Sequence, residues 1–257
     1  MRQLDRSSPL ATIDPTSQSA LEVHNLTKQF RTNTAVDQVS FSVSPGEVVG
    51  LIGPNGAGKS TTMKIITGQL LSDTGIVRVD GSDVRLESRK ARLRTGYVPQ
   101  DINLYPFLTG REHMEFVAGV KGLDLSKEPD LIESELTRFG LHEAQHRMAR
   151  EYSEGMSRKL SIALALLGNP ALLVLDECLT GLDPRAAAEV KSTITSQRQR
   201  GTAILLVSHM LEVLERICSR VLVMNRGKLV AELSEVQLQE LLTSGATLED
   251  YFLRHTD

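Results

Sequence analysis

The sequence has few cysteines, no long hydrophobic run and no excess of charge of one sign. Its two cysteines, Cys178 and Cys218, are too few for a disulfide scaffold or a cysteine-based zinc cluster, so we expect reduced thiols. The longest apolar run, Ile162–Leu167, stops at Gly168, far short of the ~20 residues that cross a membrane. The 29 basic and 32 acidic residues give a net charge of −3. This balance argues against binding to DNA or anionic lipid through bulk charge, and we expect no nucleic-acid partner.

The first twenty residues differ in composition from the rest of the chain. They are rich in Ser, Thr, Pro and Gln and lack the apolar core of a secretory signal. We expect residues 1–20 to form a mobile tail and the protein to work inside the cell. The length of 257 residues, 40% of them apolar, suits one large domain or a domain with an inserted subdomain.

Strand-like and helix-like segments alternate along most of the chain. Short apolar or alternating runs predict strands at Leu21–Leu26, Ala35–Val43, Glu47–Ile52, Gly75–Val79, Gly96–Val98, Ala171–Leu175, Ala203–Val207 and Val221–Met224. Helical spacing predicts helices at Lys59–Leu70, Leu86–Leu93, Arg111–Val120, Ser126–Phe139, Ser153–Gly168, Arg185–Arg200 and Met210–Ile217. The pattern predicts an α/β domain with a largely parallel core sheet. Residues 101–168 lack β-branched runs, so we expect a helical subdomain inserted there.

A glycine-rich loop between a predicted strand and a predicted helix carries the clearest chemical signal. It matches G-x-x-x-x-G-K-[ST] and consists of Gly53, Pro54, Asn55, Gly56, Ala57, Gly58, Lys59, Ser60 and Thr61. Glycines let backbone amides approach phosphate oxygens closely, and the helix that follows adds its positive dipole end. Lys59 supplies a charge for the β- and γ-phosphates, and the Ser60 hydroxyl is a ligand for Mg²⁺. The loop predicts a nucleoside triphosphate site.

A second motif is a buried strand that ends in two acids. Residues 172–177 read Leu-Leu-Val-Leu-Asp-Glu, which brings carboxylates to the edge of the sheet where α/β proteins bind ligands. Asp176 is placed to hold Mg²⁺ through its hydration shell, and Glu177 to orient or deprotonate the attacking water. By itself the pattern also fits a strand-end cap, but next to the phosphate loop it indicates a catalytic pair.

In this order the motifs resemble those of the ATP-binding subunit of an ABC transporter, over about residues 21–255. The resemblance implies a P-loop NTPase core with an N-terminal antiparallel β-subdomain and an inserted α-helical subdomain at about 101–168. It implies that ATP and Mg²⁺ are bound, and that Lys59, Glu177 and His209 act in catalysis, His209 as the switch histidine.

The resemblance assigns further residues to the nucleotide. Phe30 takes the place of the aromatic residue that stacks on adenine. Gln100, in Tyr-Val-Pro-Gln, matches the glutamine that joins Mg²⁺ and senses the membrane partner. Ser153 and Gly155 match the signature stretch, and Asp183 lies in the segment that resembles the dimer-contacting loop.

The implied partners are a second ATP-binding subunit and a transmembrane permease. Two chains would pair head to tail, as a homo- or heterodimer, on the cytoplasmic face of the membrane. Met156, Arg158–Leu160 and the tail Thr247–Leu253 resemble the exporter (ABC-2-like) branch, so export through a separately encoded permease is expected. An importer ATPase, a membrane-independent ABC-type ATPase and a non-hydrolysing regulator remain alternatives.

Two residues depart from the family pattern. Glu154 replaces a signature glycine, and Cys178 replaces the proline that usually follows the catalytic glutamate. A carboxylate ~7 Å from a triphosphate would be repelled by roughly 2 kcal/mol at an effective dielectric of ~20. If the side chain points to solvent, screening removes most of that repulsion. One hypothesis is that replacing Glu154 with glycine tightens ATP-driven dimerisation.

Overall fold

The computed structural model describes residues 19–256. Residues 1–18 of the predicted mobile tail therefore lie outside the described part of the chain. At the end of that predicted tail, Ala20 is buried, and its amide donates a hydrogen bond to the carbonyl of Val43 at 2.9 Å. The fold thus already includes Ala20.

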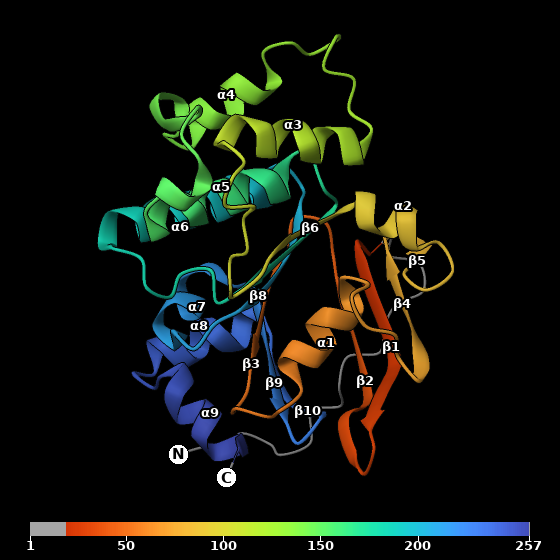
Figure 1. The fold of residues 1–257 in the computed structure, drawn as a ribbon. Helices are drawn as coiled ribbons and strands as arrows, with labels where there is room; N and C mark the ends of the chain where they lie inside the picture. The colour runs from red at the N-terminus through yellow and green to blue at the C-terminus, as the bar shows by residue number, and fades with distance from the viewer. Residues whose placement is uncertain (1–18, 257) are drawn as a thin grey trace.

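Two sheets organise the described residues (Figure 1). An antiparallel sheet has the order β2-β1-β4-β5, and a six-stranded sheet has the order β10-β9-β3-β8-β7-β6. In the second sheet all neighbours are parallel except β9 and β10. The strands are β1 Leu21–Phe30, β2 Asn33–Val43, β3 Val48–Ile52, β4 Thr74–Val79, β5 Ser82–Asp83, β6 Thr95–Val98, β7 Leu172–Asp176, β8 Ala203–Val207, β9 Arg220–Asn225 and β10 Lys228–Leu233.

Helices cover the central sheet on both faces. They are α1 Lys59–Ile66, α2 Ser88–Leu93, α3 Gly110–Lys121, α4 Leu131–Arg138, α5 Glu154–Leu166, α6 Pro184–Gln199, α7 Leu211–Ile217, α8 Glu235–Thr243 and α9 Leu248–Thr256. Figure 1 shows α1 between the two sheets, α3 to α5 gathered at one end, and α7 to α9 against the other side. Short 3-10 turns lie at His142–Ala144 and Ala149–Glu151.

The central strands are buried on both faces. In β3, Val48 and Ile52 join one apolar cluster, while Val49 and Leu51 join the other. Because alternate residues of a strand point to opposite faces, such a strand needs apolar residues throughout. This explains why the core strands read as unbroken apolar runs. The predicted α/β class, with a P-loop core and an antiparallel β-subdomain, is confirmed.

Local signals placed several helix boundaries correctly. Thr109 caps α3 by accepting a hydrogen bond from the Glu112 amide, and the Glu112 carboxylate accepts one from the Thr109 amide. Helix α5 begins directly after Ser153, whose hydroxyl accepts from the Met156 amide. These caps are sequence-local, which is why the pattern could reveal them.

Other boundaries differ from the prediction. The helix expected from residue 126 begins only at Leu131, because Asp124 holds Ser126 in a turn and Pro129 disfavours helix at the residue before it. Helix α1 ends at Ile66, shortly before Gly68, which has φ +71°. The β9–β10 hairpin and helices α8 and α9 complete the C-terminal part, where the sequence had yielded only the strand at 221–224.

Candidate nucleotide site

The glycine-rich loop connects β3 to α1, and Lys59 folds back over it. The Lys59 ammonium donates to the carbonyls of Gly53 at 2.5 Å and Pro54 at 3.0 Å. Gly58 has φ +103°, and a Cβ there would collide with the carbonyl of Ala35, so no other residue fits. The backbone amides in the first turn of α1 have no carbonyl within the helix to which they could donate a hydrogen bond. They and Lys59 form a cradle suited to phosphate.

The acidic pair lies at the same sheet edge as this loop. Asp176 ends β7, directly opposite Val207 of β8, and β8 in turn pairs with β3 ahead of the loop. Burial, then the charge of Glu177, raises the pKa of Asp176, while Lys59 opposes the shift. Burial lowers the pKa of Lys59, and the charges of Glu177 and Asp176 act against that. Lys59 begins α1 directly after the loop, and the two acids lie at the end of β7, so the ammonium and both carboxylates share one edge of the sheet.

Glu177 is held in an unusual backbone conformation with one carboxylate oxygen fixed. Its φ is +49°, uncommon for a residue with a side chain, and its amide donates to the carbonyl of Val207 at 3.0 Å. Oε2 accepts from the Thr180 hydroxyl at 3.0 Å and from the His209 amide at 3.3 Å. Oε1 is buried without a hydrogen-bond partner in the described part of the chain, although His209 Nε2 approaches it to 3.3 Å. Oε1 is therefore the oxygen able to accept a further hydrogen bond.

The remaining residues predicted for the same nucleotide lie at the start of α1 and at the ends of strands. Ser60 is exposed and Thr61 half-buried at the start of α1. Gln100 is exposed and follows β6. The last residue of β6, Val98, pairs with Leu175 of β7, which directly precedes Asp176. Phe30 ends β1 with 46% of its surface exposed and the Lys28 ammonium 5.5 Å from its ring centre. An exposed ring fits a stacking surface better than a core residue.

The signature residues lie on a separate surface. Ser153, Gly155 and Asp183 line one groove of about 750 Å³ between α4, α5 and α6, and no residue of the glycine-rich loop contributes to it. Asp183 caps α6 by accepting from the amides of Arg185 and Ala186, and these hydrogen bonds lower its pKa. Within one chain, the structure thus does not bring these three residues together with Lys59.

Two residues that the sequence analysis did not assign to the site touch its parts. Thr180 binds Glu177, as described above, and Arg158 of α5 donates from Nη1 to the carbonyl of Gln100 at 3.3 Å. Thr180 lies three residues after Glu177, which could have served as a local signal. Arg158 and Gln100 are 58 positions apart, and no local pattern predicts that contact.

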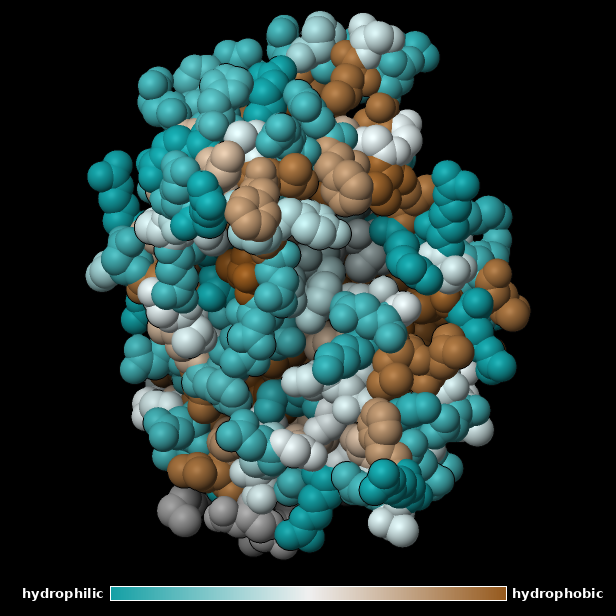
Figure 2. Space-filling view, viewed as in Figure 1, coloured by the Kyte–Doolittle hydropathy of each residue, from teal (hydrophilic) through white to brown (hydrophobic). Residues whose placement is uncertain are grey.

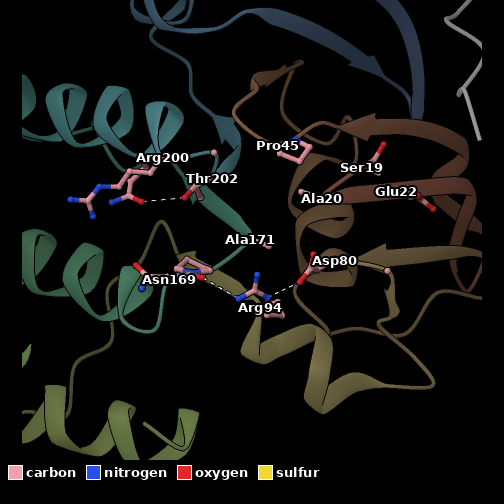
Figure 3. A pocket seen from close by; sticks show the side chains of 14 residues that line it. Ser19, Ala20, Glu22, Pro45, Asp80, Arg94, Asn169, Ala171, Arg200 and Thr202 are labelled. Carbon is pink, nitrogen blue, oxygen red and sulfur yellow. Dashed lines mark hydrogen bonds and ion pairs between the residues drawn. The ribbon is translucent and has the colours of Figure 1, made fainter. Parts of the chain in front are cut away.

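A further cavity, of about 540 Å³, opens where the central strands begin, at the edge opposite the carboxylates (Figure 3). Arg94 crosses it, bound to Asp80 at 2.7 Å and to the carbonyl of Asn169 at 3.3 Å. None of the predicted site residues lines this cavity. The cavity therefore does not belong to the candidate site.

Neither a membrane span nor a preformed metal cage is found in the described residues. No helix within residues 19–256 is long and apolar enough to cross a bilayer. The same part of the chain contains no group of three or more His, Cys, Asp or Glu side chains that could hold a metal ion. Mg²⁺ usually keeps waters and binds through one or two carboxylates plus substrate phosphates. The Asp176 carboxylate at the end of β7 and the Ser60 hydroxyl at the start of α1 suit that mode.

Comparisons with known proteins agree with this geometry. The family described as ABC transporter matches residues 36–180. The Nod factor export ATP-binding protein I of Paraburkholderia xenovorans is 37% identical over 84% of this chain and 71% of its own length. The linearmycin resistance ATP-binding protein LnrL of Bacillus subtilis is 35% identical over 82% of this chain and 68% of its own.

Larger relatives and solved structures match as well. The human phospholipid-transporting ATPase ABCA7 is 37% identical over 91% of this chain, which spans only 11% of that protein. A solved ATP-binding subunit of an ABC transporter superposes with a TM-score of 0.86 and 30% identity, covering 93% of this chain and all of its own. A second solved cassette, in its ADP conformation, superposes with a TM-score of 0.75 and 27% identity over 91% of this chain and 99% of its own. The chain belongs to the ABC transporter family, as an ATP-binding cassette.

Proposed function

We propose that this chain hydrolyses Mg²⁺-bound ATP to drive export of a substrate through a separately encoded membrane permease. The observation that carries the chemistry is the meeting of Lys59, Asp176 and Glu177 at the carboxyl edge of the central sheet. The direction of transport is supported by the relatives named for export and for antibiotic resistance. A position on the cytoplasmic face of the membrane, through the permease, follows from this proposal.

The proposed roles at the phosphates follow from side-chain chemistry. Lys59 and the first amides of α1 bind the β- and γ-phosphates, while the Phe30 ring stacks on the base. Ser60, Gln100 and Asp176 would hold Mg²⁺, since hydroxyl, amide and carboxylate oxygens suit that ion. When bound, Mg²⁺ neutralises the charge that develops on the phosphate oxygens.

Glu177 is the proposed general base. Its Oε2 is fixed by Thr180 and the His209 amide, which leaves the buried Oε1 to accept a proton from the attacking water. The strained backbone at Glu177 supports a functional role, because such conformations persist where the fold enforces them. His209 Nε2, 3.3 Å from Oε1, is placed to contact the same water or the γ-phosphate.

A second cassette is proposed to complete each site. Ser153 caps α5, so the positive end of that helix, with Gly155 in its first turn, opens onto the groove shared with Asp183. This groove excludes the glycine-rich loop of the same chain, so its anion-binding end suits the nucleotide of a partner chain. Both a homodimer and a heterodimer satisfy this requirement.

We take the helical segment at about residues 101–168 as a subdomain of a cassette that spans residues 21–255. The proposed permease contact is an aromatic patch on this segment. The patch consists of Tyr105, Phe107, Phe116 and Val120, each at least half exposed. Tyr105 and Phe116 pack edge to face at 5.9 Å, and Arg150 lies 5.4 Å from the Phe107 ring. Figure 2 shows hydrophobic residues at the surface around α3. Contiguous exposed aromatic surface typically marks a protein contact.

Phosphate release by the purified chain with ATP and Mg²⁺ tests the chemistry. We expect turnover that Glu177→Gln abolishes while ATP binding persists, because the substitution removes the base and keeps the size of the side chain. The matched control is Glu240→Gln, at an exposed position of α8. Turnover that survives Glu177→Gln would exclude the proposed base.

Co-expression with the permease encoded beside the gene tests the transport role. We expect the wild type to co-purify with a membrane protein of six spans, and the Phe107→Ser/Phe116→Ser variant to lose it with an unchanged melting temperature. Retention of the permease by that variant would exclude the patch. A neighbouring solute-binding protein would favour import instead of export.

A further inference from the structure

Arg158 is a buried cation whose donors are poorly satisfied. Only 6% of its side chain is exposed. Nη1 makes a long hydrogen bond of 3.3 Å to the Gln100 carbonyl, and the buried Nε has no hydrogen-bond partner among residues 19–256. A guanidinium carries five N–H donors, and leaving them without acceptors in the interior is costly. The energy of Arg158 therefore depends strongly on where its few partners lie.

Glu154 turns its carboxylate toward its own chain. Oε1 lies 3.7 Å from Arg158 Nη2 and 3.0 Å from the position that a Cβ would take on Gly181. The side chain is 68% exposed, so it is anchored on one side only. Its charge is thus directed at the guanidinium and at the backbone of residues 178–184. This arrangement does not require the carboxylate to face a partner's triphosphate.

These contacts join three separate segments of the nucleotide site. Gln100 follows β6, Arg158 and Glu154 belong to the first turns of α5, and Gly181 lies between Glu177 and α6. The charge of Arg158 also reaches the neighbour of Glu177: burial raises the pKa of the Cys178 thiol to about 12, and Arg158 opposes that shift. A displacement of any one segment changes how well the buried guanidinium is satisfied.

We propose that Arg158 and Glu154 are positioning residues that couple the Gln100 segment to the N-terminus of α5. The proposal rests on the proposed function, because it assigns roles at the same nucleotide site. The Gln100 carbonyl accepts a hydrogen bond from Nη1 of the guanidinium, and the Glu154 carboxylate lies 3.7 Å from Nη2. When the Gln100 segment moves, Arg158 transmits the movement to the helix end that carries Ser153.

ATP-driven dimerisation in the Glu177→Gln background, followed by light scattering, tests the coupling. Glu154→Gln and Arg158→Lys should each weaken dimerisation roughly three- to tenfold, the size of a lost charged contact. ATP binding to the isolated chain should stay unchanged in Glu154→Gln, because this largely exposed carboxylate pairs with Arg158 and lies against Gly181, away from the glycine-rich loop. The double variant should lose no more dimerisation than the more strongly affected single variant, because both substitutions break the same connection.

Glu115→Gln is the matched control, because it removes an ion pair of the same spacing, with Arg111 at 3.0 Å, on the exposed face of α3. It should leave dimerisation unchanged. Tighter dimerisation of Glu154→Gln would show that the carboxylate repels the triphosphate and would overturn the proposal, as would additive effects in the double variant. If Arg158→Lys fails to fold, the largely exposed Glu154 still supplies the decisive variant. Failure of the wild type to bind ATP would instead refute the proposed function.

Discussion

The hydroxyl of Thr180 donates a hydrogen bond of 3.0 Å to Oε2 of Glu177. Together with the His209 amide, this contact fixes one carboxylate oxygen and leaves the other, Oε1, to face the site. A general base must be held at a defined angle to the water that it activates. The segment that follows Glu177 therefore helps to orient the base, in addition to any contact with a second chain.

Replacing Thr180 with valine should lower kcat about tenfold with little change in KM for ATP, since a hydrogen bond to a charged group is worth about 1.5–3 kcal/mol. Thr180→Ser, which keeps the hydroxyl, should retain most of the activity. Thr195→Val removes an exposed hydroxyl on α6 that bonds only its own helix, and should behave as wild type. Steady-state phosphate release measures all three. An unchanged kcat in Thr180→Val would show that the contact does not orient the base.

Lys59→Ala should weaken ATP binding roughly a hundredfold, because a buried ammonium that meets phosphate makes strong charge-assisted hydrogen bonds. Lys64→Ala removes an exposed ammonium from the same helix and should leave affinity near the wild-type value. Equilibrium binding of a fluorescent ATP analogue with Mg²⁺ compares them. Equal losses in both variants would mean that only bulk charge matters.

Asp176→Asn should raise the melting temperature of the nucleotide-free protein at pH 7–8. Burial raises the pKa of Asp176, so the folded state holds this proton more tightly than the unfolded state does. Above that pKa the buried charge destabilises the fold, and the advantage of Asn should shrink as the pH falls and Asp176 protonates. Melting curves across pH 4–8 measure the difference.

The opposite sign is expected at Asp250, which supplies the control for Asp176. A hydrogen bond from the Thr247 side chain lowers the Asp250 pKa. Its charge therefore stabilises the fold above the unfolded pKa, and that contribution is lost as the pH falls through the folded value. Asp250→Asn should lower the melting temperature at pH 7 and converge with wild type in acid. The same pH trend in both variants would contradict the assignment.

Gly119→Ala should stabilise the protein by about 0.5–1 kcal/mol, since glycine within a helix costs about that much relative to alanine. Gly119 is exposed in α3, and a Cβ there would meet nothing within 4 Å. Gly58→Ala is the contrasting variant, because its Cβ would strike the Ala35 carbonyl at φ +103°. It should lower stability and abolish nucleotide binding. Urea unfolding distinguishes the two, and a destabilised Gly119→Ala would contradict the helix geometry.

The local features of the site could be predicted from the sequence. The glycine-rich loop and the strand ending in Asp176 each depend on residues within a few positions of one another. Backbone conformation and burial pattern act at that range, so spacing alone identified the loop, the acidic strand end and the α/β class. The helix expected from residue 126 was wrong at its start, because helical spacing was given more weight than the proline at 129.

The tertiary structure alone decided the contacts between distant segments. Arg158 meets Gln100 across 58 positions, and Glu154 lies against Gly181 on a different part of the chain. Neither contact follows from periodicity, because it depends on how α5 packs beside β6 and on where the segment after Glu177 turns. The sequence by itself predicted which residues bind and cleave a triphosphate. Packing placed Gly181 against the Glu154 carboxylate and the Gln100 carbonyl against Arg158, because these contacts join segments that only the folded chain brings together.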